Sequence, residues 1–458
     1  MRVTVIGTGY VGAVTGACLG WLGHRVTCVD TNSSRIERLR AGISPIYEPG
    51  LEDLLRAAMA DGGLDFTTSL DQPVRESEVI FIAVGTPSMP SGEANLSYLE
   101  TAARGIGAAL TTSAAGPGFR VIVNKSTVPV GSGNLVGTLV REGMANGSQG
   151  GFGVASNPEF LREGSAIHDS FFPDRIVVGA EDSRTLDVMR ALYAPLVAQQ
   201  FAAPPFAPRP TAIGTIPFVG TTLTSAEMIK YSANAFLAMK IGFANEMANI
   251  CERVGADITQ VMAGIGLDSR IGPKFLNAGL GWGGSCFGKD IRSLVHTAKE
   301  YGYHARLLET SLAVNDAQRL SVIQKLQEKL RILKGRTVAL LGLAFKPDTD
   351  DLRDAPSLQI AARLTQMGVR VRAFDPVAMD ICREQNPDLA IAYCASAEEA
   401  CTGSDALILV TEWQQFAALD LVALAGRMSH AVLIDGRNLF DPGAARAAGF
   451  DYCGIGRP

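Results

Sequence analysis

A glycine-rich stretch, GWGGSCFGKD at 281–290, carries the residue types best suited to covalent chemistry. It places Cys286 among glycines, with Lys289 and Asp290 directly behind it. A thiol in such a turn meets a substrate with little steric obstruction, and a cation close by favours the nucleophilic thiolate. A core-filling cysteine usually sits within an apolar periodic run, so the sequence predicts that Cys286 is reactive.

The start of the chain predicts a dinucleotide site. Gly7, Gly9 and Gly12 form G-x-G-x-x-G between a strand-like and a helix-like segment. The first two glycines allow a tight turn and close approach of a pyrophosphate, and the third lets helix and strand pack closely. Asp30 closes the second predicted strand, where a carboxylate accepts hydrogen bonds from ribose hydroxyls and repels a 2′-phosphate. The pattern favours NAD over NADP, although Arg35 tempers this preference.

A thiol and a hydride acceptor together permit a specific reaction sequence. An aldehyde is captured as a thiohemiacetal, oxidised to a thioester and hydrolysed to an acid. The five histidines lie outside the candidate motifs, which disfavours a histidine base or a metal site. The eight cysteines show no C-x-x-C pair, so we expect neither disulfides nor zinc.

Further polar residues have both a structural and a functional interpretation. Thr86 and Thr127 each follow a predicted strand, where they either face the ligand crevice or serve as turn residues. Glu159 and Glu163 are four residues apart, so a helical turn would put both carboxylates on one face; the alternative is a solvated helix start.

Lys230 and Asn234 are also four residues apart, within the otherwise apolar run MIKYSANAFLAM. Polar groups on a largely buried helix need partners, because unpaired burial costs ~1–3 kcal/mol each. They are either a satisfied intrahelical or interdomain pair or donors aimed at the oxyanion of a covalent intermediate.

Strand-and-helix alternation predicts the fold class, which is α/β with two Rossmann-like doubly wound parallel-sheet domains joined by an all-helical middle domain. We expect an NAD-binding domain at 1–205, a helical central and dimerisation domain at 206–330, and a second, smaller C-terminal α/β domain at 331–458. The middle domain would surround a long central helix with Thr224 or Ser225 as its N-cap. The expected strands are 2–6, 25–29, 79–84, 120–124, 152–156, 175–178, 336–342, 369–375, 405–410 and 431–435.

Composition narrows the class of protein. The 458 residues are 47% hydrophobic and 19% charged, as in ordinary globular proteins. A formal net charge of −5 does not favour binding to nucleic acid or to an anionic membrane. A predicted strand directly after Met1 leaves no room for a signal peptide, and no apolar run reaches the ~18 residues of a membrane helix. We therefore expect a cytoplasmic protein.

Taken together, these motifs resemble the UDP-glucose/GDP-mannose dehydrogenase family of nucleotide-sugar dehydrogenases. The resemblance runs nearly end to end. It rests on GTGYVG (7–12), GTPS (85–88), KSTVPVG (125–131), NPEFLREG (157–164), EMIKYSANAFLA (227–238), GGSCFGKD (283–290), GLAFKPDTDDLRDAP (342–356) and DGRN (435–438). One departure is Gly288, where the family commonly has a larger residue; glycine predicts a more permissive turn.

The resemblance implies NAD-dependent four-electron oxidation of UDP-glucose to UDP-glucuronate by a homodimer or larger assembly, without a metal. It also implies that the C-terminal domain, 331–458, binds the UDP-sugar. It implies Cys286 as nucleophile, Lys230 and Asn234 at the oxyanions, Asp290 and Thr127 at the water, and Glu159 as acid or base. Implied cofactor residues are Gly7, Gly9, Tyr10, Val11, Gly12, Asp30, Arg35, Thr86, Thr127, Glu163, Lys289 and Arg353. Implied substrate residues are Glu159, Phe160, Leu161, Lys230, Asn234, Arg270, Phe275, Gly283, Phe345, Lys346 and Arg437.

Three alternatives remain at this point. A sister enzyme acting on GDP-mannose or a UDP-N-acetylhexosamine shares the thiol, lysine and asparagine. A two-electron β-hydroxyacid dehydrogenase would need no thiol and would release one NADH per substrate. A non-catalytic nucleotide-sugar or NAD-binding protein would not need Cys286 at all.

Overall fold

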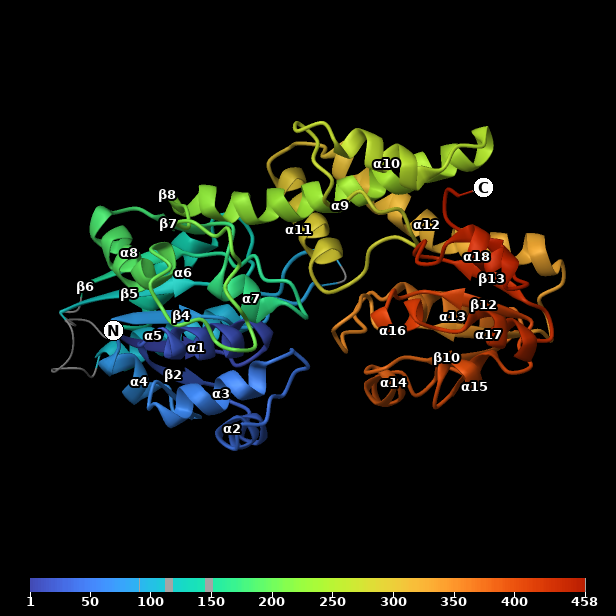
Figure 1. Cartoon of the computed structure of the whole chain (residues 1–458). Coiled ribbons are helices and arrows are strands. Elements are labelled where there is room, and N and C mark those ends of the chain that lie inside the picture. The colour runs from blue at the N-terminus through green and yellow to red at the C-terminus, as the bar shows by residue number, and fades with distance from the viewer. Residues whose placement is uncertain (90, 112–117, 145–150, 458) are drawn as a thin grey trace. The chain divides into compact units, whose positions relative to one another are not determined.

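The computed structural model describes residues 1–89, 91–111, 118–144 and 151–457. The chain forms two compact units, residues 1–232 and 233–458 (Figure 1). A 32-residue helix, α9 (Leu223–Val254), begins in the first unit and continues into the second.

The first unit is built on an eight-stranded sheet with the order β3-β2-β1-β4-β5-β6-β7-β8. Its strands are β1 (Arg2–Ile6), β2 (Arg25–Val29), β3 (Leu64–Thr67), β4 (Val79–Ile82), β5 (Phe119–Asn124), β6 (Gly151–Ser156), β7 (Ile176–Ala180) and β8 (Phe218–Thr221). Its other helices are α1 (Tyr10–Trp21), α2 (Ser33–Arg40), α3 (Leu51–Ala60), α4 (Asp71–Glu76), α5 (Ser97–Thr111), α6 (Ser132–Gly143), α7 (Ala166–Phe171) and α8 (Ser183–Val197).

Successive residues of these strands pack into two different cores. Phe81 on β4 joins the core with α1, α3, α7 and α8, whereas its neighbours Ile80 and Ile82 join the core with α5 and α6. Because side chains alternate across a strand, a sheet buried on both faces needs such continuous apolar runs. This explains why the central strands could be recognised from sequence.

The second unit contains a six-stranded parallel sheet with the order β11-β10-β9-β12-β13-β14. Its strands are β9 (Thr337–Leu341), β10 (Arg370–Phe374), β11 (Ile391–Tyr393), β12 (Ala406–Leu409), β13 (Val432–Asp435) and β14 (Asp451–Cys453). Its helices are α10 (Ile258–Gly266), α11 (Phe287–Glu300), α12 (Arg306–Leu330), α13 (Pro356–Gln366), α14 (Met379–Gln385), α15 (Ala397–Cys401), α16 (Gln414–Ala417), α17 (Leu421–Arg427) and α18 (Pro442–Ala447).

The predicted fold class is confirmed, with corrections of detail. One pair in the first sheet, β6 with β7, is antiparallel, and the sheet gains β8 from beyond the proline-rich 201–217 segment. The N-cap prediction for α9 is wrong: the helix starts at Leu223, and Thr222 Oγ1 accepts a hydrogen bond of 3.2 Å from the Ser225 N–H. Thr222, rather than Thr224 or Ser225, therefore caps the long helix.

The two sheets place an aspartate at the same position, directly after the second strand. Asp30 follows β2 and Asp375 follows β10, and each accepts from the loop after the unit's first strand. The Asp375 carboxylate is buried and accepts from five donors, which are the N–H groups of Leu343, Ala344, Val377 and Ala378 and the Trp413 indole.

Candidate functional site

The glycine fingerprint forms a tight turn between β1 and α1. Gly7 has a φ of +95°, a conformation that strains residues with a Cβ. A Cβ on Gly12 would lie 1.8 Å from the Gly7 carbonyl oxygen, so only glycine fits there. A Cβ on Gly9, the N-cap of α1, would meet no atom of the described residues within 4 Å. The turn thus combines open space with helix N–H groups, and Tyr10 and Val11 begin the helix.

Asp30 closes this turn from β2. Its Oδ2 accepts from the Thr8 N–H at 2.9 Å, the Thr8 hydroxyl at 2.8 Å and Arg35 Nη1 at 3.1 Å, while Oδ1 accepts from the Asn32 N–H at 3.0 Å. Burial raises the pKa of Asp30, but the hydrogen bonds from Asn32 and Thr8 outweigh it, so the pKa lies below its ordinary value. With one bond on Oδ1, the carboxylate keeps room to accept a ribose hydroxyl. The turn therefore fits NAD.

Two predicted threonines meet at the next strand ends. The Thr86 hydroxyl donates to the Thr127 carbonyl at 2.7 Å, which joins the loops after β4 and β5. A pocket in the first unit contains Thr127 and Lys230 together. It is lined by Asn124, Ser126, Thr127, Val128, Ser156, Pro158, Glu227, Lys230 and Tyr231.

The segment that carries Glu159 and Glu163 is not helical, so both sequence interpretations of this acid pair are wrong. Helix α7 begins only at Ala166. Glu159 is 8% exposed; its Oε2 accepts from the Leu161 N–H at 2.7 Å and its Oε1 from Lys230 Nζ at 2.9 Å. Glu159 is therefore half of a buried ion pair.

Phe160 lies between two cations. The Arg175 guanidinium is 3.8 Å from the ring centroid and Lys230 Nζ is 5.4 Å away. Cation–π contacts of this kind hold an aromatic side chain in one orientation.

Helix α9 presents Lys230 and Asn234 one turn apart. In the second unit, Asn234 Nδ2 donates to Asp290 Oδ2 at 2.6 Å, and Lys289 Nζ contacts Asp290 Oδ1 at 2.6 Å. Asp290 is 1% exposed, so its charge is held by these two donors. Lys230 and Asn234 thus both have the partners that burial requires, but these are Glu159 and Asp290 rather than an intrahelical pair.

Cys286 is exposed and is the N-cap residue of α11. The Asp290 N–H donates to its carbonyl at 2.9 Å, and Ser285 Oγ lies 3.5 Å from its sulfur. Helix N-termini stabilise thiolates. Gly288 lies in the first turn of α11, where a Cβ would lie 2.9 Å from Arg292 Nη1 and 3.3 Å from Asp354 Oδ2.

Loops of the second unit converge beside this cysteine. The Gly284 N–H donates to the Arg353 carbonyl at 2.9 Å, and a Cβ on Gly283 would lie 2.5 Å from the Asp354 carbonyl oxygen and 3.2 Å from Phe345 Cβ. Arg437 Nη1 donates to the Gly281 carbonyl at 3.2 Å. The structure therefore brings Gly283, Phe345, Arg353 and Arg437 to the Cys286 loop.

The remaining predicted substrate residues are more dispersed. Lys346 Nζ lies 5.4 Å from the Phe345 ring centroid. Arg270 is highly exposed and pairs with Asp268 at 2.6 Å. Phe275 has a φ of +63°, a strained conformation for a bulky residue and one often found near ligands.

Sequence reasoning missed two buried carboxylates of the first unit. Glu227 accepts from the Gly131 and Gly133 N–H groups and the Ser156 hydroxyl, and so ties the Thr127 loop to α9. Its position three residues before Lys230, on the same helix face, was an available signal. Glu48 contacts the dinucleotide turn, and its motif IYEPGL gave no such signal.

The described part of the chain contains neither a candidate metal site nor a membrane-spanning helix. In that part of the chain, no group of three or more His, Cys, Asp or Glu side chains is placed to hold a metal ion. None of its helices is long and apolar enough to cross a membrane.

A glycine turn that fits NAD and an exposed thiol at a helix N-terminus define the class as a nucleotide-dependent dehydrogenase. Family profiles identify the particular group, and the chain belongs to the UDP-glucose/GDP-mannose dehydrogenase family. The NAD binding domain of that family matches residues 1–197, its central domain 224–317 and its UDP binding domain 339–442.

Individual relatives agree along the whole chain. UDP-glucose 6-dehydrogenase TuaD of Bacillus subtilis is 45% identical, covering 100% of this chain and 93% of the relative. The UDP-glucose 6-dehydrogenase of Rhizobium meliloti is 45% identical and covers 100% of both. A UDP-glucose dehydrogenase structure from the archaeon Pyrobaculum islandicum superposes with a TM-score of 0.89 at 38% identity, covering 100% of this chain and 98% of that one.

Proposed function

We propose that this protein oxidises UDP-glucose to UDP-glucuronate, with two NAD and one water consumed and two NADH released. The observation that carries the proposal is an exposed thiol, Cys286, at the N-terminus of α11, one turn before Asp290. Full-length similarity to UDP-glucose 6-dehydrogenases supports the choice of sugar.

The cysteine accounts for the second half of the reaction. Bound NAD would accept a hydride in each of the two oxidations. The Cys286 thiolate adds to carbon 6 of the aldehyde, and the new oxyanion takes a proton to give a thiohemiacetal. Loss of a hydride and a proton yields a thioester. Water then adds to its carbonyl, and the C–S bond breaks to return the thiol and the acid.

Other side chains assist by charge and hydrogen bonding. Lys230 and Asn234 are N–H donors suited to the oxyanions. Asp290 and Thr127 would position the water, and Glu159 would accept or return its proton. Burial raises the Glu159 pKa but Lys230 lowers it by more, which keeps the carboxylate charged and able to accept a hydrogen bond from water.

Binding roles follow the same assignment. For NAD we propose Gly7, Gly9, Tyr10, Val11, Gly12, Asp30, Arg35, Thr86, Thr127, Glu163, Lys289 and Arg353. For UDP-glucose we propose Glu159, Phe160, Leu161, Lys230, Asn234, Arg270, Phe275, Gly283, Phe345, Lys346 and Arg437. We also propose the domain division 1–205, 206–330 and 331–458, each part of which contains one of the matched profiles.

Turnover with a panel of nucleotide sugars tests the proposal. UDP-glucose should give two NADH per molecule and an acid product. Activity confined to GDP-mannose or a UDP-N-acetylhexosamine would identify the sister enzyme instead. One NADH per substrate would indicate β-hydroxyacid chemistry, and binding without turnover would indicate a binding protein.

We propose that the protein resides in the cytosol with reduced thiols. We also propose that it is a homodimer joined through α9. Phe236, Phe243 and Ile250 recur every seven residues on α9 and are 61%, 47% and 47% exposed. Such a stripe on one helix face marks an interaction surface. Light scattering should give a dimer mass, and Phe243→Glu should shift it toward the monomer. Tyr98→Glu, at another exposed aromatic residue, should not.

A further inference from the structure

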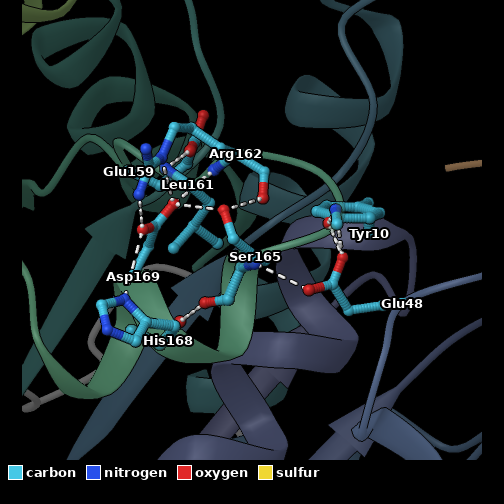
Figure 2. Close-up of polar contacts among 11 residues, drawn as sticks. Tyr10, Glu48, Glu159, Leu161, Arg162, Ser165, His168 and Asp169 are labelled. Carbon is cyan, nitrogen blue, oxygen red and sulfur yellow. Dashed lines mark hydrogen bonds and ion pairs between the residues drawn. The ribbon is translucent and has the colours of Figure 1, made fainter. Parts of the chain in front are cut away.

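A buried polar cluster joins three segments of the first unit that are distant in sequence. Glu48, 6% exposed, lies in the loop before α3. Its Oε1 accepts from the Ala166 N–H at 2.7 Å, and its Oε2 accepts from the Gly164 N–H at 2.6 Å and from the Tyr10 hydroxyl. Figure 2 shows Tyr10 and Glu48 pointing toward each other beside the segment that ends at Ser165. Thus one carboxylate contacts both the dinucleotide turn and the segment after β6.

In each hydrogen bond of the cluster, the chemistry of the groups fixes which one donates and which one accepts. Burial raises the pKa of Tyr10, and the Glu48 charge raises it further, so the phenol stays protonated and donates. The Gly164 N–H also lies 3.1 Å from the Tyr10 hydroxyl oxygen. Because both backbone N–H groups can only donate, Glu48 must offer an acceptor oxygen on each side.

The opposite end of the segment is held by other residues. Glu159 bonds Leu161 and Lys230. Asp169 accepts from the Arg162 N–H at 2.9 Å and from its guanidinium at 2.6 Å (Figure 2). Glu163 lies between this end and Gly164. Glu48 therefore links the Glu163 end of the segment to Tyr10, the first residue of α1, alongside the direct 3.1 Å bond from the Gly164 N–H to the Tyr10 hydroxyl.

We propose that Glu48 is a positioning residue that couples NAD binding at the glycine turn to the placement of Glu163 and the Gly164–Ala166 backbone. The inference rests on the proposed use of NAD. NAD at the turn fixes Tyr10, Tyr10 fixes Glu48, and Glu48 holds the two backbone N–H groups. Cofactor binding then orders the segment that is to meet the sugar.

Glu48→Gln is a sharp test, because the glutamine amide has one acceptor oxygen and one donor NH2 group. In either orientation the NH2 group faces a backbone N–H, so the bond to Gly164 or to Ala166 is lost. Hydrogen–deuterium exchange with and without NAD measures how strongly NAD binding protects this segment, and it does not require turnover. In the wild type we expect NAD to slow exchange of the 160–171 amides at least roughly fivefold. In the variant this slowing should disappear, while NAD affinity stays within about threefold because the Asp30 contacts remain.

Tyr10→Phe is the second variant. It leaves both backbone bonds to Glu48 in place and removes the two bonds of the Tyr10 hydroxyl, to Glu48 and from the Gly164 N–H. These bonds link the segment to α1, so the NAD-dependent slowing should fall here too. Asp182→Asn is the matched control, since Asp182 caps a different helix, α8, through the Thr185 N–H and hydroxyl. That control should keep the NAD effect.

The outcomes separate the two proposals. Undiminished slowing in both Glu48→Gln and Tyr10→Phe would overturn the coupling while leaving the dehydrogenase assignment intact. A wild type that does not bind NAD would overturn both. Where NAD binds and the coupling is present, kcat should fall at least roughly tenfold in Glu48→Gln, with the KM for NAD little changed.

Discussion

Lys230 and Glu159 form an ion pair of 2.9 Å, and their side chains are only 5% and 8% exposed. The pair joins α9 to the segment after β6 within the first unit. Burial raises the pKa of Glu159, and the Lys230 charge and hydrogen bond lower it by more, so the folded-state pKa lies below the ordinary value. The charge of Glu159, the proposed acid or base, thus depends on Lys230, a proposed oxyanion donor.

Lys230→Met should destabilise the protein at neutral pH, because it leaves the Glu159 carboxylate buried without its cation. We expect the free energy of unfolding to fall by about 3–5 kcal/mol in urea titrations at pH 7. In the wild type, a lowered pKa gives stability that is present above the unfolded value of about 4.3 and is lost as pH falls through the folded pKa. In the variant the Glu159 pKa is raised, so its penalty shrinks as pH falls.

The gap between wild type and variant should therefore be narrower at pH 4 than at pH 7. Lys240→Met, on the same helix, removes only a 3.2 Å bond to the Ile271 carbonyl and should cost less than about 1 kcal/mol. Equal losses in the two variants would contradict the buried-pair interpretation.

Cys286→Ser should bind NAD and UDP-glucose but form the acid at least about 10³-fold more slowly, because a hydroxyl is a far weaker nucleophile than a thiolate. Product analysis should detect an aldehyde-level or covalent species. Cys453→Ser changes a half-buried thiol of the same unit and should keep activity within about twofold. Full activity in Cys286→Ser would end the thioester proposal.

Asn234→Asp should place a second carboxylate against Asp290, where the Asn234 amide now donates at 2.6 Å. Repulsion raises the pKa of one of the two acids, so the pair should share a proton at lower pH. We expect kcat to fall about 10²-fold above neutral pH and to recover partly under mildly acidic conditions. Asn249→Asp, whose side chain bonds Gln318 instead, should show no such pH profile.

Asp30→Asn should weaken NAD binding, since the amide cannot serve as an acceptor at both oxygens. We expect the KM for NAD to rise about 10- to 100-fold with kcat changed less than about threefold, and discrimination against NADP to shrink. Kinetics with both cofactors measure this. An unchanged KM would mean that Asp30 serves only its bonds to Thr8 and Asn32.

The central strands could be predicted because they are buried on both faces and read as unbroken apolar runs. Four short strands, β3, β8, β11 and β14, were missed; they have three or four residues each and lie at or near sheet edges. Their formation depends on pairing with a neighbour rather than on local pattern. The antiparallel direction of β7 was also beyond local sequence, because the connection decides it.

Some residues of the candidate site could likewise be predicted from sequence, and others could not. Cys286 and Asp30 could be predicted because the motifs that indicate their roles lie close to them in the sequence. Glu48 did not, because its partners Tyr10, Gly164 and Ala166 are 38, 116 and 118 residues away. The helical interpretation of Glu159 and Glu163 failed for a related reason: bonds to Lys230 and Glu48 hold that segment open.

The difference between Asp375 and Asp30, which hold matching places in the two sheets, has a consequence for inhibitor design. Its oxygens are saturated by the unit's own groups, whereas Asp30 at the matching place keeps an acceptor to spare. Drug-like mimics of adenosine should accordingly titrate with a stoichiometry of one per polypeptide, and a chemist seeking a cofactor-competitive inhibitor has a single carboxylate to design against.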